Sequence, residues 1–147
     1  MISLLFVCAG NKCRSPAAAA IFSKMAKDAG RGHEFGVDSA GTYAKGAGQP
    51  ADQRMIKAAA SRGYKISTIA KRVKSSDVYL YHMILAMDGD NLKYVQDMKP
   101  KTSIFRLAEA QLLCADGVPD PYLGDEKAFS STLDQLERAC AELLKRI

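Results

Sequence analysis

The stretch Ser3-Leu4-Leu5-Phe6-Val7-Cys8 decides the fold of this chain. It is an apolar run of strand length, and an unbroken run of this kind is typical of a strand that helices bury on both faces. A loop of small and polar residues separates it from Ser15-Pro16. Serine is a preferred N-cap and proline is tolerated at the first helical position, so this dipeptide predicts a helix with Ser15 as its N-cap. A strand, a loop and a helix in this order predict one unit of a parallel sheet.

The rest of the chain continues the alternation of strands and helices. We expect further strands at residues 35–40, 78–87 and 103–107, and helices from Ser15 to a stop at Gly30 and at residues 52–62, 88–95 and 129–147. This alternation predicts an α/β fold in which helices flank a doubly wound sheet of four parallel strands. Ligands bind beyond the carboxyl ends of the strands in such sheets, so we expect an anion-binding loop directly after the first strand.

Length and composition indicate a single domain over residues 1–147. A chain of 147 residues and 15.9 kDa has the size of one hydrophobic core. Hydrophobic residues make up 48% of the chain and charged residues 25%, which excludes a disordered or low-complexity protein. The longest apolar runs hold six residues, whereas a membrane span needs roughly 20, and the N-terminus lacks the features of a signal peptide. We therefore expect a cytoplasmic protein with no membrane partner.

The positive net charge suits an anionic substrate but does not indicate nucleic-acid binding. Lys and Arg outnumber Asp and Glu by 21 to 16, which gives a formal net charge of +5. Such an excess favours anionic ligands in general. The densest cluster, Lys71, Arg72 and Lys74, has no interleaved aromatic residue. We interpret it as a solvated face and expect no nucleic-acid partner.

The four cysteines favour free thiols over disulfides. Cys8, Cys13, Cys114 and Cys140 would suffice for two bridges, but the first two lie close in sequence and nothing marks secretion. We therefore expect reduced thiols, at least one of them reactive. Cys140 lies on the apolar stripe of the last helix, and we interpret it and Cys114 as packing residues.

The two histidines do not indicate a metal site. His33 and His82 have no ligand spacing with another histidine or with a cysteine, so we expect neither a metal nor another cofactor. Tyr79 and Tyr81 lie near His82 within a predicted strand, and we interpret both as sheet packing.

The segment that follows the first strand has the residues of an anion-binding loop. Gly10 and Asn11 are the residue types that most readily adopt positive φ, so the loop can curl until its backbone N–H groups point inward. The helix behind it adds the positive end of its dipole, and the guanidinium of Arg14 matches two phosphate oxygens. This arrangement predicts a site for a tetrahedral dianion. The residues that would form it are Ala9, Gly10, Asn11, Lys12, Cys13 and Arg14.

Cys8 would lie at the bottom of this loop, where the same donors stabilise a thiolate and make it a nucleophile at neutral pH. The Ser15 hydroxyl could donate a hydrogen bond to that sulfur and later help it leave. Taken alone, a cysteine at the end of a buried strand is more often an inert core residue. The Gly-Asn curl, Arg14 six residues later and the Ser-Pro helix start favour the nucleophile.

At these residues the chain resembles the low-molecular-weight protein tyrosine phosphatases. Their signature has the form V-C-x-G-N-x-C-R-S-P, and residues Val7 to Pro16 match every fixed position of it. Three further stretches look like family landmarks in family order: residues 38–42, Met87-Asp88 with Asn91, and Asp120-Pro121-Tyr122.

The resemblance implies a role for each residue of the site. It implies that Cys8 is the nucleophile, Arg14 the clamp on phosphate and transition state, and Ser15 the partner of the thiolate. Asn11 is implied to organise the loop. Cys13 matches a second cysteine that forms a protective disulfide with the nucleophile in the family.

Asp120 is implied to be the general acid and then the general base. Its chemistry fits independently of the family, because a leaving aryl or alkyl oxygen needs a proton, which is worth typically ~10²–10⁴ in rate. An Asp-Pro-Tyr sequence without a nucleophile motif would be read as a turn.

Aromatic residues near the site favour an aryl phosphate. Tyr122 would form a wall for a phenyl ring, and Tyr43 and Lys45 stand where eukaryotic members often place an aromatic wall. Leu123 departs from the pattern, since many members carry a second aromatic residue there. Lys12 adds positive charge at the rim, which favours acidic sequences around the phosphorylated residue.

These features predict a protein tyrosine phosphatase that works through a phosphocysteine and needs no metal. Three alternatives stay open: a protein arginine phosphatase of the same fold, a thiol-linked arsenate reductase, and a non-catalytic phosphoprotein-binding or phosphocysteine-carrying module. Arsenate reductases need a further redox cysteine pair, and Cys114 and Cys140 are 26 residues apart. The expected partners are phosphorylated proteins or peptides, and the expected state is a monomer or a weak dimer.

Overall fold

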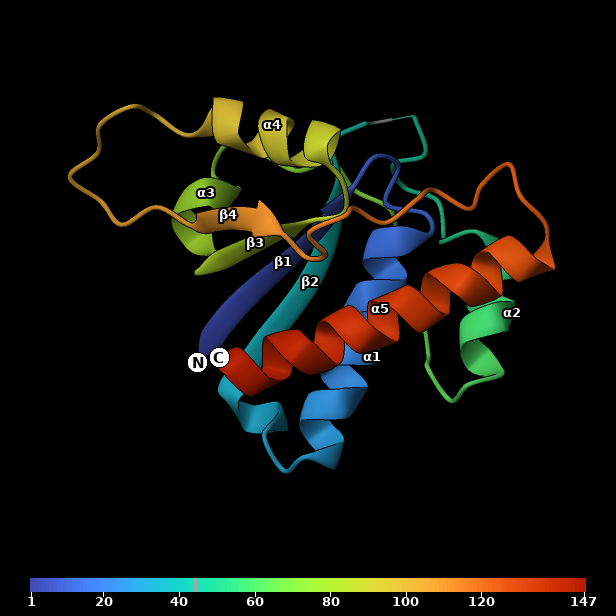
Figure 1. Ribbon diagram of the computed structural model, residues 1–147. Helices are drawn as coiled ribbons and strands as arrows, with labels where there is room; N and C mark the ends of the chain where they lie inside the picture. Colours follow the sequence, from blue (N-terminus) through green and yellow to red (C-terminus); the bar gives the residue numbers. More distant parts are fainter. Residues whose placement is uncertain (44) are drawn as a thin grey trace.

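The structure is a computed structural model that describes residues 1–43 and 45–147, and its centre is a parallel sheet (Figure 1). The strands run in the order β2-β1-β3-β4. They are β1 (Ile2–Cys8), β2 (Phe35–Gly41), β3 (Met83–Ala86) and β4 (Glu109–Leu112). All three pairings are parallel, which confirms the predicted single-domain sheet of four parallel strands.

The register brings the carboxyl ends of the strands to one edge of the sheet. Cys8 lies opposite Gly41, and Val7 lies opposite Ala86. Ala86 in turn pairs with Leu112. Because β1 is a central strand, the loop that follows it emerges in the middle of this edge, where open α/β sheets bind ligands.

Helices cover both faces of the sheet (Figure 1). Their bounds are α1 (Arg14–Asp28), the 3-10 turn η1 (Gly32–Glu34), α2 (Gln53–Ala60), α3 (Asp77–Leu80), α4 (Gly89–Met98) and α5 (Glu126–Arg146). Helices α1, α2 and α5 lie on one face, and α3 and α4 lie on the other. Each face therefore has its own apolar core.

The β1 strand contributes alternate side chains to the two cores. Leu4, Phe6 and Cys8 belong to the cluster with α1, α2 and α5. Leu5 and Val7 belong to the smaller cluster that also contains residues of α3 and α4. Successive side chains of a strand point to opposite faces, so a strand buried on both sides must be apolar throughout. This confirms the interpretation of the opening stretch.

The larger core centres on α1 and α5. Phe22 of α1 packs edge-on against Phe35, with ring centroids 5.1 Å apart, and also contacts Phe6. Cys140 of α5 is fully buried with its Sγ 3.6 Å from the Ala18 carbonyl oxygen. The packing role predicted for Cys140 is confirmed, and Cys114, half-buried, packs against the same cluster.

The predicted third strand was wrong in its first half. Residues 77–80 form α3, and only Met83–Ala86 forms a strand. The buried Asp77 carboxylate accepts the Lys74 N–H at 2.8 Å, which closes a turn that starts the helix. Tyr79 is therefore exposed rather than packed in the sheet, whereas Tyr81 is half-buried against the smaller core.

The predicted fourth strand at residues 103–107 was also wrong. The strand is Glu109–Leu112, which pairs with β3, and residues 103–107 form a loop that exposes Ile104 and Phe105. The apolar and β-branched composition of 103–107 suits a strand, but strand formation requires a partner, and β3 pairs further along the chain. No helix in the part of the chain that the structure describes is long and apolar enough to cross a membrane.

Candidate active site

The loop between β1 and α1 turns its carbonyl groups outward. The carbonyls of Cys8 and Ala9 accept the N–H groups of Thr42 and Tyr43, and that of Lys12 accepts the Asp52 N–H. Within residues 1–43 and 45–147, no N–H of residues 10–14 donates to a backbone carbonyl. These N–H groups are thus left without a backbone partner, which is what an anion-binding loop requires.

Asn11 makes the curl of the loop possible. Its φ of 56° places it in the left-handed region, which asparagine tolerates better than most residues. Gly10 was predicted to share this conformation, but its φ is not positive. One residue in the left-handed region thus suffices to turn the chain.

The buried Asn11 side chain ties the loop to two other segments. Its Nδ2 donates to Ser15 Oγ at 2.8 Å and to Ser39 Oγ at 2.9 Å, while its Oδ1 accepts the Lys71 N–H at 3.0 Å. Gly41 lets the loop approach β2, since a Cβ at this position would lie 2.6 Å from the Ala9 carbonyl oxygen. The geometry therefore suits the organising role that the resemblance implied for Asn11.

Cys8 lies at the floor of the loop and is 2% exposed. Its Sγ is 3.0 Å from Ser15 Oγ. That hydroxyl accepts from Asn11, and its single hydrogen has two acceptors within reach, the Ala40 carbonyl oxygen at 3.3 Å and the nearer Cys8 sulfur. Ser15 was predicted to cap the helix, but α1 begins at Arg14 and its cap residue makes no side-chain bond. The hydroxyl faces Cys8 instead.

Cys13 is buried, lines the same pocket as Cys8 and is held as a neutral thiol. Desolvation, followed by the charges of Asp52 and Asp120, raises the pKa of Cys13 from 9.0 to about 12. Cys8 and Cys13 are both free thiols here.

Arg14 is a buried cation with its orientation fixed by hydrogen bonds. Its Nη1 donates to Asp88 Oδ2 at 2.7 Å and to the Val118 carbonyl at 2.9 Å. Its Nη2 lies 3.7 Å from Asp120 Oδ2. The guanidinium therefore stands between the loop and Asp120, where a bound phosphate would contact it.

Sequence reasoning assigned no role to Asp88. It follows β3 at the carboxyl edge of the sheet, and its Oδ1 accepts the Asn91 N–H at 2.9 Å to cap α4. The signal that could have found it was the stretch Met87-Asp88 with Asn91, which was noted as a family landmark. Its position after the strand next to β1 is what places its carboxylate beside Arg14.

Asp120 lies on the loop that leads to α5. Its carboxylate is half-exposed, and its Oδ1 accepts the Tyr122 N–H at 3.0 Å. This local bond holds the carboxylate on the pocket side of the loop, opposite the amides of the β1–α1 loop.

A pocket of about 520 Å³ joins these groups. It is lined by Cys8, Ala9, Gly10, Lys12, Cys13, Arg14, Tyr43, Lys45, Gly46, Gln49, Asp120 and Tyr122. Every predicted site residue lines it except Asn11 and Ser15, which lie behind the loop. Gly46 and Gln49 were not predicted, and no motif marked them.

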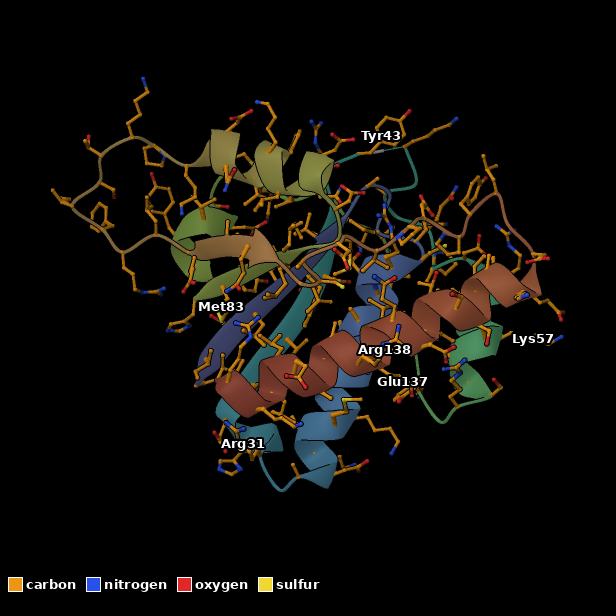
Figure 2. All side chains as sticks on the ribbon, in the orientation of Figure 1. Arg31, Tyr43, Lys57, Met83, Glu137 and Arg138 are labelled. Carbon is orange, nitrogen blue, oxygen red and sulfur yellow. The ribbon has the colours of Figure 1, made fainter. Side chains whose placement is uncertain are left out.

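The rim of the pocket is aromatic and basic. Tyr43, which projects from the loop after β2 (Figure 2), and Tyr122 are both more than half exposed. The Lys12 ammonium donates to the Pro50 carbonyl at 2.6 Å and to Gln49 Oε1 at 3.3 Å, so it is anchored at the rim. Among the described residues, no group of three His, Cys, Asp or Glu side chains gathers as metal ligands would.

Comparisons with known proteins agree with this geometry. A sequence model of the low molecular weight phosphotyrosine protein phosphatases matches residues 3–147. The chain is 34% identical to the chicken (Gallus gallus) low molecular weight phosphotyrosine protein phosphatase over 98% of this chain and 94% of that protein.

Solved structures show the same similarity. A protein tyrosine phosphatase from Entamoeba histolytica with Hepes in its active site superposes with a TM-score of 0.92 at 38% identity, over 99% of this chain and 96% of that one. A Drosophila arginine phosphatase superposes with a TM-score of 0.91 at 26% identity, over 97% and 96% of the two chains.

Proposed function

Since the chain belongs to the low molecular weight phosphotyrosine protein phosphatase family, whose members are cysteine-dependent hydrolases, we propose that Cys8, Arg14, Ser15 and Asp120 carry out its reaction. The substrate is a phosphorylated protein or peptide, and the bond that breaks joins phosphorus to the side-chain oxygen.

In the first step the Cys8 thiolate attacks phosphorus and forms an S–P bond while the P–O ester bond breaks. Asp120, in its acid form, donates its proton to the leaving oxygen. Arg14 and the N–H groups of residues 10–14 bind the three equatorial oxygens as the transition state forms. Because these donors supply the positive charge, we propose that no divalent cation is required.

In the second step water cleaves the S–P bond of the phosphocysteine. Asp120 is now a carboxylate and accepts a proton from the attacking water, which returns it to its acid form. The electron pair of the S–P bond returns to Cys8, and Ser15 Oγ, 3.0 Å from the sulfur, donates a hydrogen bond to the departing thiolate. Inorganic phosphate leaves and the enzyme is regenerated.

The rim supports phosphotyrosine as the substrate. Tyr43 and Tyr122 line the same pocket as Cys8 and present exposed rings that would flank a phenyl group. Lys12 and Lys45 add positive charge to the rim, which favours acidic residues around the phosphotyrosine.

The observation that carries this proposal is the 3.0 Å contact between Cys8 Sγ and Ser15 Oγ at the floor of a pocket-lining loop whose N–H groups at residues 10–14 have no backbone acceptor among the described residues. The test is the initial rate of para-nitrophenyl phosphate hydrolysis. Cys8→Ser should abolish it, Asp120→Ala should reduce it by ~10²–10⁴, and excess chelator should leave it unchanged. Full activity of Cys8→Ser, or a strict Mg²⁺ requirement, would overturn the proposal.

An arginine phosphatase is the second candidate, because the Drosophila arginine phosphatase has nearly the same backbone. A panel of phosphotyrosine, phosphoarginine and phosphoserine peptides separates the two, and we expect the phosphotyrosine peptide to be hydrolysed fastest. Arsenate with a thiol reductant, run in parallel, should give no turnover.

We propose a cytoplasmic location and a chain that acts as a monomer or weak dimer without nucleic-acid or membrane partners. A nucleophilic thiol next to a second thiol needs a reducing compartment to stay active, which supports the location. Fractionation of cells that produce the protein, followed by sedimentation of the purified chain, tests both points.

A further inference from the structure

An ion pair outside the predicted site contacts two loops that line the pocket. Asp52 and Arg54 stand at the start of α2, and neither residue was singled out in the sequence. Their contacts reach the β1–α1 loop on one side and residues 119–123, which we name the acid loop, on the other.

Asp52 forms the link to the β1–α1 loop. Its N–H donates to the Lys12 carbonyl at 2.9 Å, and its carboxylate caps α2 by accepting the Arg54 N–H at 2.8 Å. The same carboxylate accepts from the Arg54 side chain twice, at 3.1 Å from Nε and 2.8 Å from Nη2. Hydrogen bonds from Arg54 hold the pKa of Asp52 below its usual value, so the pair is ionised at neutral pH.

Arg54 forms the link to the acid loop. Its Nη2 donates to the Tyr122 carbonyl at 2.9 Å, and its guanidinium lies 5.4 Å from the centroid of the Tyr122 ring. On its other side the guanidinium lies 4.7 Å from the ring of the buried Phe129. The cation thus packs against the core of the protein and contacts Tyr122 through both its backbone and its ring.

Tyr122 is also the residue that orients Asp120. The Tyr122 N–H donates to Asp120 Oδ1 at 3.0 Å, and within residues 1–43 and 45–147 the other polar contact of this carboxylate is Arg14 Nη2 at 3.7 Å. The orientation of the half-exposed Asp120 carboxylate therefore depends on where Tyr122 is held, and Arg54 is what holds Tyr122.

We infer that Arg54, fixed by Asp52, is a positioning residue that sets the acid loop so that Asp120 can protonate the leaving group. The inference rests on the proposed role of Asp120. Arg54 acts through Tyr122 and does not touch the reacting atoms.

This role predicts an effect that depends on the leaving group. The value of kcat/KM reports the steps up to cleavage of the P–O bond, in which Asp120 gives its proton. Phenyl phosphate has a poor leaving group that needs this proton, whereas the anion of a dinitrophenol leaves without it. Loss of Arg54 should therefore lower kcat/KM for phenyl phosphate on the order of tenfold, and for dinitrophenyl phosphate less than about twofold.

The experiment compares Arg54→Met and Arg54→Lys with wild type on both substrates. Methionine keeps the packing against Phe129 but removes the hydrogen bonds, and lysine keeps the charge but cannot hold Asp52 and Tyr122 together. We expect partial recovery in Arg54→Lys. The matched control is Arg62→Met. It removes an arginine paired with Asp134 and Glu137, none of which lines the pocket, and it should change kcat/KM equally for the two substrates.

A double-mutant cycle with Asp120→Asn tests whether Arg54 acts through Asp120. If Arg54 acts through Asp120, then Arg54→Met should have no further effect on phenyl phosphate once Asp120 is replaced. An effect of Arg54→Met that is the same for both substrates, or that adds fully to that of Asp120→Asn, overturns the inference and leaves the proposed function intact. If Asp120→Asn alone leaves the leaving-group dependence unchanged, the acid assignment fails and the inference fails with it. Arg54→Lys keeps the test valid if Arg54→Met does not fold.

Discussion

Arg14 Nη1 and Asp88 Oδ2 lie 2.7 Å apart and form the shortest contact of the buried guanidinium. The carboxylate comes from the end of β3 and the guanidinium from the start of α1, so the pair joins two neighbouring loops at the carboxyl edge of the sheet. One edge of the guanidinium is thereby occupied, and Nη2 is left facing Asp120 across the pocket. An arginine held in this way needs little reorganisation when a phosphate binds.

Replacement of Asp88 by asparagine should therefore weaken catalysis without unfolding α4. Asparagine is a good N-cap, so the helix keeps its cap, but the charge-assisted bond to Arg14 is lost. Such bonds are worth about 1.5–3 kcal/mol, so kcat/KM should fall on the order of 10- to 100-fold. Kinetics and thermal melting check this, and an Asp88→Asn variant with wild-type kcat/KM would show that the pair does not orient Arg14.

Ser15→Ala should lower the reactivity of the nucleophile. The substitution removes the hydroxyl 3.0 Å from Cys8 Sγ, so the thiolate loses a hydrogen-bond donor. We expect inactivation by iodoacetate near neutral pH to slow, and kcat to fall, each on the order of tenfold. Ser23→Ala on the exposed side of the same helix is the control, and equal rates in the two variants would argue against the role of Ser15.

Gly41→Ala should displace the β1–α1 loop. The added Cβ would lie 2.6 Å from the Ala9 carbonyl oxygen and 2.9 Å from the Asn11 nitrogen, both of them backbone atoms that cannot move without the loop. We predict loss of phosphate binding, measured by inhibition with inorganic phosphate. Gly89→Ala, where a Cβ meets nothing within 4 Å, should retain wild-type binding, and a normal phosphate affinity in Gly41→Ala would contradict the prediction.

Stability should fall at alkaline pH because of buried thiols. Desolvation raises the pKa of Cys140 from 9.0 to about 12. Below about pH 9, the pKa of this thiol in the unfolded chain, the buried Cys140 thiol makes its full contribution to the free energy of unfolding. As pH rises toward 12 the unfolded thiol ionises and the folded one does not, so the free energy of unfolding decreases.

Urea denaturation of wild type and Cys140→Ala at a series of pH values measures this contribution. Alanine removes the titrating group, so the decrease in stability between about pH 9 and about pH 11 should be smaller in the variant than in wild type. Equal decreases would mean that Cys140 does not contribute to alkaline unfolding.

Local sequence pattern was sufficient for much of this fold. The apolar run before Cys8, the helix after Pro16 and the periodic last helix each follow from spacing alone, because their burial repeats within the segment itself. The strand at Glu109–Leu112 does not follow, since it is short and only partly buried, and its pairing with β3 decides its place. Residues 103–107 had the better strand composition but no partner.

In the candidate site, too, some residues could be predicted from local sequence and others depend on contacts that only the fold creates. Cys8, Arg14 and Ser15 stand in one continuous motif, and the structure brings Asp120 to them as predicted. Asp88 and Arg54 could not be assigned, because each acts through a partner distant in sequence: Asp88 is 74 positions from Arg14, and Arg54 is 68 from Tyr122. The predicted contact of Ser15 with Cys8 is present, but its predicted place as the helix cap was wrong, because a serine hydroxyl before a proline suits both tasks.

The central claim is that the Cys8 sulfur accepts the phosphoryl group, and the most direct measurement is mass spectrometry of the protein after rapid acid quench during turnover. We predict a phosphoryl group on the Cys8-containing peptide, at a higher steady-state level in Asp120→Ala with an activated aryl phosphate, because hydrolysis of the intermediate is then slow. An unmodified Cys8 in wild type and variant under conditions of full turnover would contradict the account.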